Sequence, residues 1–192
     1  MRRFSILVFS IVVLAALIDV VRPRTRLRSF ADVLLEEINK VPLCSYTDRL
    51  YGFTVRYLAC FRPERSGGPE CAGRARFRHD SWTSIVLECY VTRAVAVDNT
   101  EVCDWRCLAR RLHARAKAAG GGGYVMSGPL YEDGSRVPGY GHYTKCVRNG
   151  KLWFCYALTY PEEYKASLGR LFALVERWQP WPGQAVMTSD RA

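Results

Sequence analysis

The longest run of apolar residues lies at the N-terminus of the chain. It covers residues 4–21, contains Asp19 as its one charged residue, and is flanked by Arg3 and Arg22. As a helix this run reaches about 27 Å at roughly 1.5 Å per residue, close to the hydrocarbon core of a bilayer, which is about 30 Å thick. The pattern therefore predicts an uncleaved signal-anchor, a transmembrane helix over residues 1–21.

Two other interpretations of this run stay open. A cleaved signal peptide needs a small-residue cut site, and the best candidate, which ends at Ala15, lies inside the apolar run. A buried core helix is disfavoured, because the run is apolar on all faces and lies between arginines. Orientation is open as well. The arginines of a predicted basic spacer over residues 22–29 favour a cytosolic domain by the positive-inside rule, whereas the cysteines favour an oxidising compartment.

Helical patterns occur at three places in residues 30–178, the predicted cysteine-rich domain. Residues 30–41 place apolar side chains on one face, and Ser29 before them is a favourable N-cap. Residues 103–119 predict a second helix with a cationic face. Residues 161–178 predict a third helix, whose apolar stripe we expect to belong to the core.

Extended patterns separate these helices. Apolar and polar positions alternate over residues 50–61, and β-branched and aromatic residues alternate again over residues 82–97. Residues 140–160 predict a hairpin, because Asn149 and Gly150 between two alternating runs are typical of a type I′ turn.

Together these patterns predict an α+β fold. It consists of an N-terminal transmembrane helix and a compact disulfide-stapled domain with an antiparallel sheet and about three helices. An exposed loop over residues 62–78 and an extended tail over residues 179–192 complete the organisation. The chain of 192 residues has room for one such domain after the anchor.

The chain is basic, with a net charge of +10. Such a balance suits acidic partners, anionic membrane surfaces or nucleic acid. No basic stripe with interleaved stacking aromatics occurs, so we expect no nucleic-acid partner. No Asn-x-Ser/Thr sequon occurs either, and we expect no N-glycosylation.

The eight cysteines bear on both compartment and fold. An even number behind a membrane-targeting segment indicates four disulfides in an oxidising compartment. Eight cysteines allow many pairings, so the connectivity stays open. The predicted disulfide residues are Cys44, Cys60, Cys71, Cys89, Cys103, Cys107, Cys146 and Cys155.

The predicted hairpin constrains two of these cysteines. With the Asn-Gly pair as its turn, Cys146 lies opposite Trp153, and Cys155 lies opposite Thr144. The two cysteines are then diagonal neighbours about 7–8 Å apart, which is long for a disulfide. We therefore expect each to bond elsewhere.

No catalytic set is found in the sequence. The histidines are scattered, neither His-Glu-x-x-His nor Gly-x-Ser-x-Gly occurs, and paired cysteines cannot act as nucleophiles. Cys103, Cys107 and His113 offer three zinc ligands, but their spacing is not that of a standard finger, and we expect both cysteines to bond outward. The glycines at residues 120–123 lack a following Lys-Ser/Thr and predict a helix stop. We expect a non-enzymatic protein with no metal and no cofactor.

The layout resembles that of a baculovirus envelope protein family, per os infectivity factor four. The resemblance lies in the anchor that runs into arginines, the cysteine-rich domain and two segments, LYGFTVRYLACF at residues 50–61 and GHYTKCVRNGKLWFCYALTYP at residues 141–161. The apolar run followed by Arg22, Arg24 and Arg26 is also similar to the inner-nuclear-membrane sorting signal of this virion class.

This resemblance implies a single-pass membrane protein of the virion envelope, sorted through the host inner nuclear membrane. The implied role is that of a subunit of the oral infectivity complex needed for infection of host midgut cells. Its implied partners are the membrane, other viral envelope proteins and the midgut surface. No functional residue is carried over, because the family has no catalytic motif to match.

Two other classes of function stay open. A secreted disulfide-rich effector, inhibitor or glycoprotein partner subunit requires cleavage near Ala15. The herpesvirus glycoprotein L type belongs here, because residues 41–44 resemble its VPxC start. A zinc-dependent or thiol enzyme requires free cysteines.

Overall fold

The computed structural model describes much of the chain between residues 28 and 181. The described residues are 28–64, 73–80, 84–93, 96–97, 101–102, 105–119 and 123–181. The predicted anchor over residues 1–21 lies outside them, as do most of the predicted spacer and tail. Within the described residues, no helix is long and apolar enough to cross a membrane. This finding corrects the predicted single-pass membrane localisation in the virion envelope.

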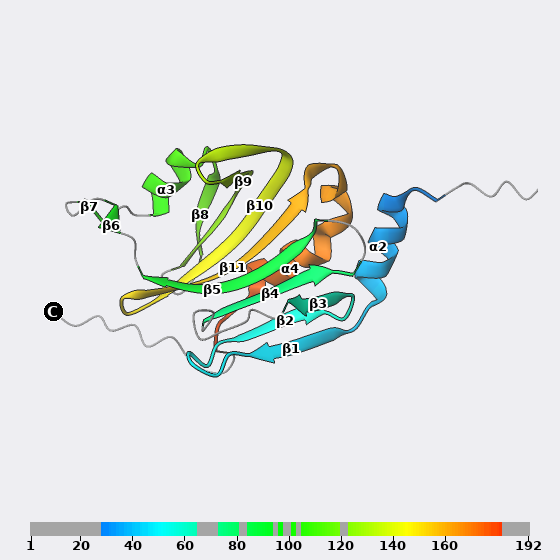
Figure 1. Cartoon of the computed structure of the whole chain (residues 1–192), viewed down its shortest axis with the longest axis horizontal. Helices are drawn as coiled ribbons and strands as arrows, with labels where there is room; N and C mark the ends of the chain where they lie inside the picture. The colour runs from blue at the N-terminus through cyan, green and yellow to red at the C-terminus, as the bar shows by residue number, and fades with distance from the viewer. Residues whose placement is uncertain are drawn as a thin grey trace, which may run out of the picture.

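A seven-stranded antiparallel sheet organises the described residues (Figure 1). Its strand order is β3-β4-β5-β11-β10-β9-β8, so β3 and β8 form its edges. The strands are β3 (Phe61–Glu64), β4 (Arg74–His79), β5 (Val86–Arg93), β8 (Arg115–Ala119), β9 (Gly123–Glu132), β10 (Ser135–Asn149) and β11 (Leu152–Pro161).

Two small antiparallel sheets and several short helices complete the fold. The small sheets are β1 (Leu43–Thr47) with β2 (Thr54–Leu58), and β6 (Ala96–Val97) with β7 (Glu101–Val102). The helices are α2 (Phe30–Lys40), α3 (Trp105–Arg111), the 3-10 helix η2 (Glu162–Leu168) and α4 (Gly169–Arg177). Figure 1 shows α2 and α3 far apart, near opposite ends of the view.

The main core lies between one face of the large sheet and the helices α2 and α4. Leu34 and Ile38 from α2, and Leu171 and Val175 from α4, are fully buried and belong to one cluster with Tyr156 of β11. Burying each such aliphatic side chain contributes about 1.5–3 kcal/mol. Packing of the helices onto the sheet therefore contributes a large share of the stability.

The first predicted helix is confirmed. It begins after Ser29, whose hydroxyl accepts a hydrogen bond from the Asp32 amide at 3.2 Å. It ends at Lys40, because Val41 already has an extended backbone and Pro42 follows. The last predicted helix is also helical, but it divides into η2 and α4 at Gly169.

The described chain is mostly sheet, which corrects the predicted α+β fold with its transmembrane helix. The predicted helix over residues 103–119 contains only α3, since residues 115–119 form the edge strand β8. The predicted loop over residues 62–78 contains most of β3 and β4. In both places pairing with a neighbouring strand overrides local propensity, as tertiary context commonly does.

The predicted hairpin forms, but its register differs from the predicted one. Asn149 pairs with Leu152, so Gly150 and Lys151 form the loop, and Gly150 has a φ of +59°. Moving a two-residue loop by one position shifts the pairing by two residues. Cys146 therefore lies directly opposite Cys155.

The two cysteines of this hairpin are bonded to each other. Their Cα atoms lie 4.2 Å apart. The prediction that each bonds elsewhere is therefore wrong.

The other cysteines also differ from the prediction of four disulfides. Cys44, Cys60 and Cys89 are free thiols. Cys107 is disulfide-bonded. Cys71 and Cys103 lie outside the described residues, so predictions about them stay predictions.

Candidate interaction surface

Helix α3 packs on the face of the sheet opposite to the main core. Its inner side carries Trp105, Ala109 and Leu112, which pack on a second apolar cluster around Tyr124 and the hairpin disulfide. The rings of Trp105 and Tyr124 stack at 5.9 Å between centroids. Burial raises the pKa of the Tyr124 hydroxyl, so this ring acts as a neutral packing surface.

The outer side of α3 is basic, with one apolar residue. Arg106, Arg110 and Arg111 are exposed, and Leu108, which neighbours Arg111 one turn before it, is 36% exposed. Arg106 lies over the Trp105 ring, with its guanidinium carbon 5.1 Å from the ring centroid. The cationic face that was predicted for residues 103–119 is therefore present, but on a shorter helix.

The C-terminal end of α3 is closed by His113 in a left-handed conformation. Its φ is +48°, a region that residues other than glycine rarely occupy. The amide of Ala114 donates to the Ala109 carbonyl at 2.8 Å, and the amide of His113 donates to the Arg110 carbonyl at 3.2 Å. These two bonds define a Schellman motif, in which glycine is the usual residue at the position of His113.

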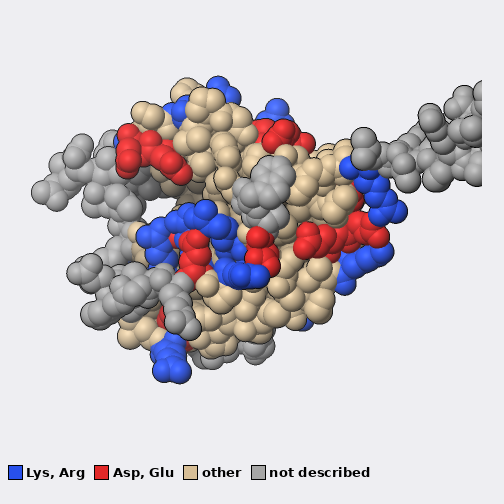
Figure 2. Space-filling view, turned by 45° about the vertical axis from the view of Figure 1, so that its right-hand side comes forward, with Lys and Arg blue, Asp and Glu red and all other residues tan. Residues whose placement is uncertain are grey.

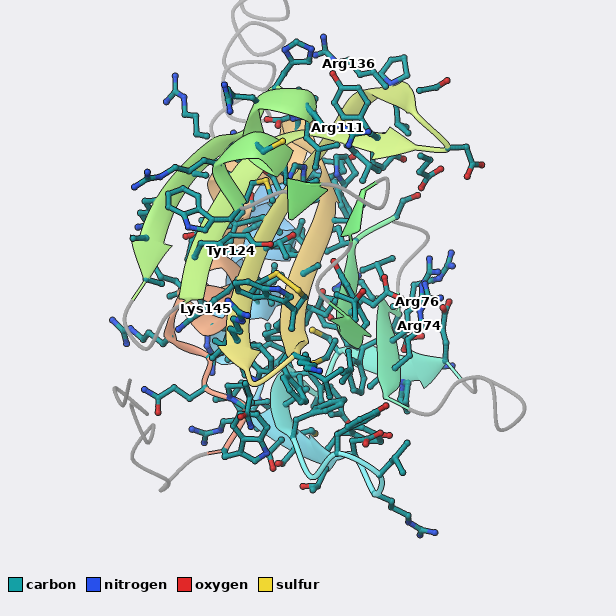
Figure 3. All side chains as sticks on the ribbon, turned by 90° about the vertical axis from the view of Figure 1, so that its left-hand side faces the viewer. Arg74, Arg76, Arg111, Tyr124, Arg136 and Lys145 are labelled. Carbon is teal, nitrogen blue, oxygen red and sulfur yellow. A yellow bond between two sulfur atoms is a disulfide. The ribbon has the colours of Figure 1, made fainter. Side chains whose placement is uncertain are left out.

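The side chain of His113 reaches the hairpin between β9 and β10. Its ring stacks on Tyr131 with centroids 6.4 Å apart and the ring planes at 28°. Tyr131 pairs across the hairpin with Arg136, so both side chains project from the same face of the hairpin. Figure 3 shows Arg111 and Arg136 together at this end of the molecule.

These residues form one surface, which we call the α3 patch. It combines three arginines, a histidine, a tyrosine and an exposed leucine from two separate parts of the chain. Its members are Leu108, Arg110, Arg111, His113, Tyr131 and Arg136.

The arginines of the α3 patch differ from those of β4, because within the described residues they have no acidic partner. Within the described residues, Arg110, Arg111 and Arg136 form no ion pair. Glu132 and Asp133 border the patch at the tip of the hairpin, but neither forms an ion pair with it. The guanidinium groups therefore face solvent with all of their donors available to a ligand.

The basic row on β4 has the opposite character. Arg74 pairs with Glu88, while Arg76 and Arg78 share Glu64 at 2.9 and 2.5 Å. Figure 2 shows basic side chains bordered by acidic ones on this face of the molecule. Because these arginines are already paired with neighbouring carboxylates, the row is a weaker candidate for binding an external anion.

The structure also bears on Cys103, Cys107 and His113, the zinc ligands that the sequence offers but that we did not expect to bind a metal. Cys107 is disulfide-bonded and cannot serve as a thiolate ligand. His113 instead stacks on Tyr131. Cys103 lies outside the described residues.

Two members of the patch, Tyr131 and Arg136, had no place in the sequence prediction. A signal for them is present, because Asp133-Gly134 lies between two runs that form strands. Both residues have positive φ angles, +49° and +77°, as a type I′ hairpin turn requires. This turn brings Tyr131 and Arg136 opposite each other.

Comparisons with known proteins place the chain near two solved structures of low similarity. The solution structure of cyanobacterial PsbP (CyanoP) from Synechocystis sp. PCC 6803 has 13% identity and a TM-score of 0.46, over 70% of this chain and 89% of that chain. The crystal structure of the Saccharomyces cerevisiae Ran-binding protein Mog1p has 9% identity and a TM-score of 0.46, over 70% and 90%.

No protein-family model matches the chain, and no curated protein matches it. The two structural likenesses do not indicate what this chain binds, because their TM-scores are below 0.5. The resemblance to the baculovirus family is not tested by these comparisons and stays a prediction.

Proposed function

We propose that this domain is a non-enzymatic binding module that docks an acidic segment of a partner protein on the α3 patch. The observation that carries this proposal is the strained His113 beside arginines that form no ion pair within the part of the chain that the structure describes. Left-handed conformations of residues other than glycine are enriched at functional sites. A glycine would close α3 at a lower conformational cost, so the presence of a histidine ring supports a role in binding.

The patch matches carboxylates in both chemistry and geometry. A guanidinium group binds a carboxylate through two parallel hydrogen bonds, and such charge-assisted bonds are stronger than neutral ones. Arg111 and Arg136 approach from different elements, so a peptide that lies across the patch would contact both. Leu108 offers an apolar contact beside them. The best-matched ligand is therefore a glutamate- or aspartate-rich segment with one apolar residue.

A protein ligand fits better than a nucleic acid. Single-stranded nucleic acids bind by stacking their bases on free aromatic faces. The Tyr131 ring is stacked on His113, and the Trp105 ring is stacked on Tyr124, so one face of each ring is taken by the fold itself. Arg106 covers the Trp105 ring as well. The arginines remain available to carboxylates, whereas the aromatic rings are not laid out as a platform for bases.

The role predicted from the baculovirus resemblance, a subunit of an oral infectivity complex, needs a surface that holds other envelope proteins. The α3 patch would supply such a surface. That role itself stays a prediction.

The proposal is tested by fluorescence anisotropy with the full chain and a labelled peptide of glutamates with one leucine. A peptide of the same length with glutamine in place of glutamate serves as the matched ligand control. We expect the acidic peptide alone to bind, and we expect binding to weaken between about 0.05 M and about 0.5 M salt, because exposed charges are screened within a few ångströms at high salt.

Matched variants distinguish binding at the α3 patch from a general effect of the net charge of the protein. The double variant Arg111→Glu, Arg136→Glu should weaken binding by about tenfold or more, which corresponds to about 1.4 kcal/mol or more. Arg49 lies in the turn between β1 and β2, away from α3 in Figure 1. The control variant Arg49→Glu should therefore leave the affinity for the acidic peptide within about twofold. Equal losses in both variants would contradict the proposal. Tighter binding of a single-stranded oligonucleotide than of the acidic peptide would also contradict it.

A further inference from the structure

A second cluster of functional side chains lies far from the α3 patch, where α2 meets the end of the large sheet (Figure 1). Glu37 comes from α2, Cys60 from the turn between β2 and β3, and His79 from the end of β4. One carboxylate oxygen, the thiol sulfur and one ring nitrogen all lie within 4.8 Å of one another. The Glu37 carboxylate is 3.3 Å from His79 Nε2.

The fold fixes each of these positions through its backbone. Phe61 pairs with His79 across β3 and β4, which brings the turn at Cys60 to the end of β4. The amide of Asp80 donates to the Cys60 carbonyl at 2.9 Å, so the backbones that carry the thiol and the imidazole are joined directly.

Helix α2 is held at the same place by Arg170 of α4. Its guanidinium donates to the carbonyls of Ile38, Asn39 and Val41 at 2.7, 3.0 and 2.8 Å. These contacts fix the end of α2 that carries Glu37. The cluster is therefore assembled by three separate elements before any ligand binds.

We propose that Glu37, Cys60 and His79 bind one divalent transition metal ion, with zinc as the best match. Zinc prefers sulfur, nitrogen and oxygen ligands at about 2.0–2.3 Å, which places neighbouring ligand atoms about 3.3–3.7 Å apart in a tetrahedral site. The distance of 3.3 Å between Glu37 and His79 lies at this spacing. Three protein ligands leave the fourth position for a water molecule.

The charges of the cluster also fit a divalent ion. A thiolate and a carboxylate carry two negative charges, and a neutral imidazole adds none, so the loaded site has no net charge. This balance matters because His79 is buried, with 3% of its surface exposed, and Cys60 is 9% exposed.

The thiol does not fit the alternative role of a catalytic nucleophile. Burial raises the pKa of Cys60 to about 11 even though the Arg170 guanidinium acts in the opposite direction, so the thiol stays protonated at neutral pH and reacts poorly. A bound metal ion would place a positive charge directly on the sulfur, since coordinated thiols lose their proton. The sulfur thus serves better as a metal ligand than as a reactive group.

The zinc set proposed here differs from the one considered in the sequence. Cys103, Cys107 and His113 are near each other in the sequence, whereas Glu37 and His79 are 42 residues apart. Their meeting depends on the packing of α2 against the sheet. We expect the bound metal to stabilise the fold, because an ion that binds only the folded chain shifts the folding equilibrium toward it.

Cobalt substitution of the full chain tests this inference. The chain is stripped with a chelator and titrated with cobalt(II), whose thiolate complexes have a sulfur-to-metal charge-transfer absorption. We expect one equivalent of cobalt to give this absorption and zinc to displace it. Zinc should also raise the thermal midpoint of the stripped protein.

Three variants decide which residues are ligands. Cys60→Ser should abolish the charge-transfer absorption, while Cys44→Ser, which removes another free thiol, should leave it unchanged. If Cys60→Ser does not fold, Glu37→Gln provides the second test, because this side chain is 39% exposed and tolerates substitution. We expect Glu37→Gln to bind cobalt at least about tenfold more weakly, with an unchanged circular dichroism spectrum. An absorption that persists in Cys60→Ser, or an affinity unchanged in Glu37→Gln, would overturn the proposal.

Discussion

At the scale of single residues, His113 holds a backbone conformation that glycine adopts more easily. Its φ of +48° closes α3, and its ring stacks on Tyr131. A left-handed conformation costs about 1–2 kcal/mol for a residue with a Cβ, and glycine avoids most of this cost. The residue at position 113 therefore makes the folded chain less stable than glycine would.

The substitution His113→Gly separates binding from folding. We expect the free energy of unfolding to rise by up to about 1 kcal/mol, because relief of strain exceeds the greater flexibility of glycine in the unfolded chain. We expect binding of the acidic peptide to weaken at the same time. Urea denaturation and fluorescence anisotropy measure the two effects. A variant that is both less stable and unchanged in binding would contradict this role for His113.

His142 gives a second prediction at the residue scale, on pH dependence. Burial lowers its pKa below the usual value of about 6.5, although its Nδ1 lies 2.9 Å from the Pro129 carbonyl. Between these two pKa values the unfolded chain binds the proton more readily than the folded one does. The stability that the neutral His142 contributes is therefore fully present above about pH 6.5 and is lost as the pH falls from there through the lowered pKa of the folded chain.

The variant His142→Gln tests this sign. It removes the titrating group but keeps a side chain that can donate a hydrogen bond to the Pro129 carbonyl. Urea denaturation between about pH 7.5 and about pH 5 should show a smaller loss of stability in the variant than in the natural chain. An equal loss in both chains would show that other groups account for it.

At the scale of elements, the β10–β11 hairpin shows what the sequence could predict and what it could not. The alternating pattern was sufficient to locate both strands. The turn was assigned to Asn149-Gly150, because both residue types accept positive φ angles. In the fold only Gly150 does so, with Asn149 still paired in the ladder. A shift of the turn by one residue, which residue propensities cannot resolve, decides whether Cys146 and Cys155 lie opposite each other.

The disulfide of this hairpin should stabilise the fold. It closes a short segment, with a sequence separation of 9, for which loop-closure entropy predicts about 2–3 kcal/mol. The double variant Cys146→Ala, Cys155→Ala should lower the free energy of unfolding by this amount, as measured by urea denaturation. Dithiothreitol should lower the stability of the natural chain by more than that of the variant, in which only the disulfide of Cys107 remains to be reduced. A variant as stable as the natural chain would contradict the prediction.

The short helix α3 marks the limit of prediction from local pattern. Residues 103–119 are rich in alanine, arginine and leucine, which favour helices, and their cationic face is present on α3. The helix nevertheless ends at Arg111, because Ala114 and Ala116 pack on the second cluster when residues 115–119 pair with β9. The left-handed backbone of His113 is a consequence of this early end, and it cannot be predicted from helix propensity.

At the scale of the whole molecule, the two candidate sites lie apart on the fold. The metal site is invisible in the sequence, because its ligands come from three elements that meet only after the sheet has formed. The sequence predicts only part of the α3 patch. The arginines of α3 belong to a local helical pattern, whereas Arg136 joins them only through the pairing of β9 with β10. The resemblance to a viral envelope family lies in the anchor, the cysteine-rich domain and two segments, one of which, residues 50–61, contains Cys60 of the metal site.

Trp178 connects the large sheet to the small sheet of β1 and β2. Its side chain is buried, its indole nitrogen donates to the Thr54 carbonyl of β2 at 2.8 Å, and its ring lies 5.5 Å from that of Tyr156. Trp178→Ala should lower stability by about 3–5 kcal/mol through the cavity that it leaves. Trp178→Phe should lose less, because it keeps most of the packing but not the hydrogen bond. Urea denaturation of both variants checks this order, and equal losses would contradict it.

The two outer strands of the large sheet have a consequence for the protein in concentrated solution. Unpaired strand borders are templates on which further chains can add and form aggregates, and charges or proline there oppose such growth. The strand β3 carries Pro63, which has no amide to donate, and β8 carries Arg115 and Lys117 on its exposed side. Both borders thus resist the addition of another copy, and the domain should remain dispersed at high concentration.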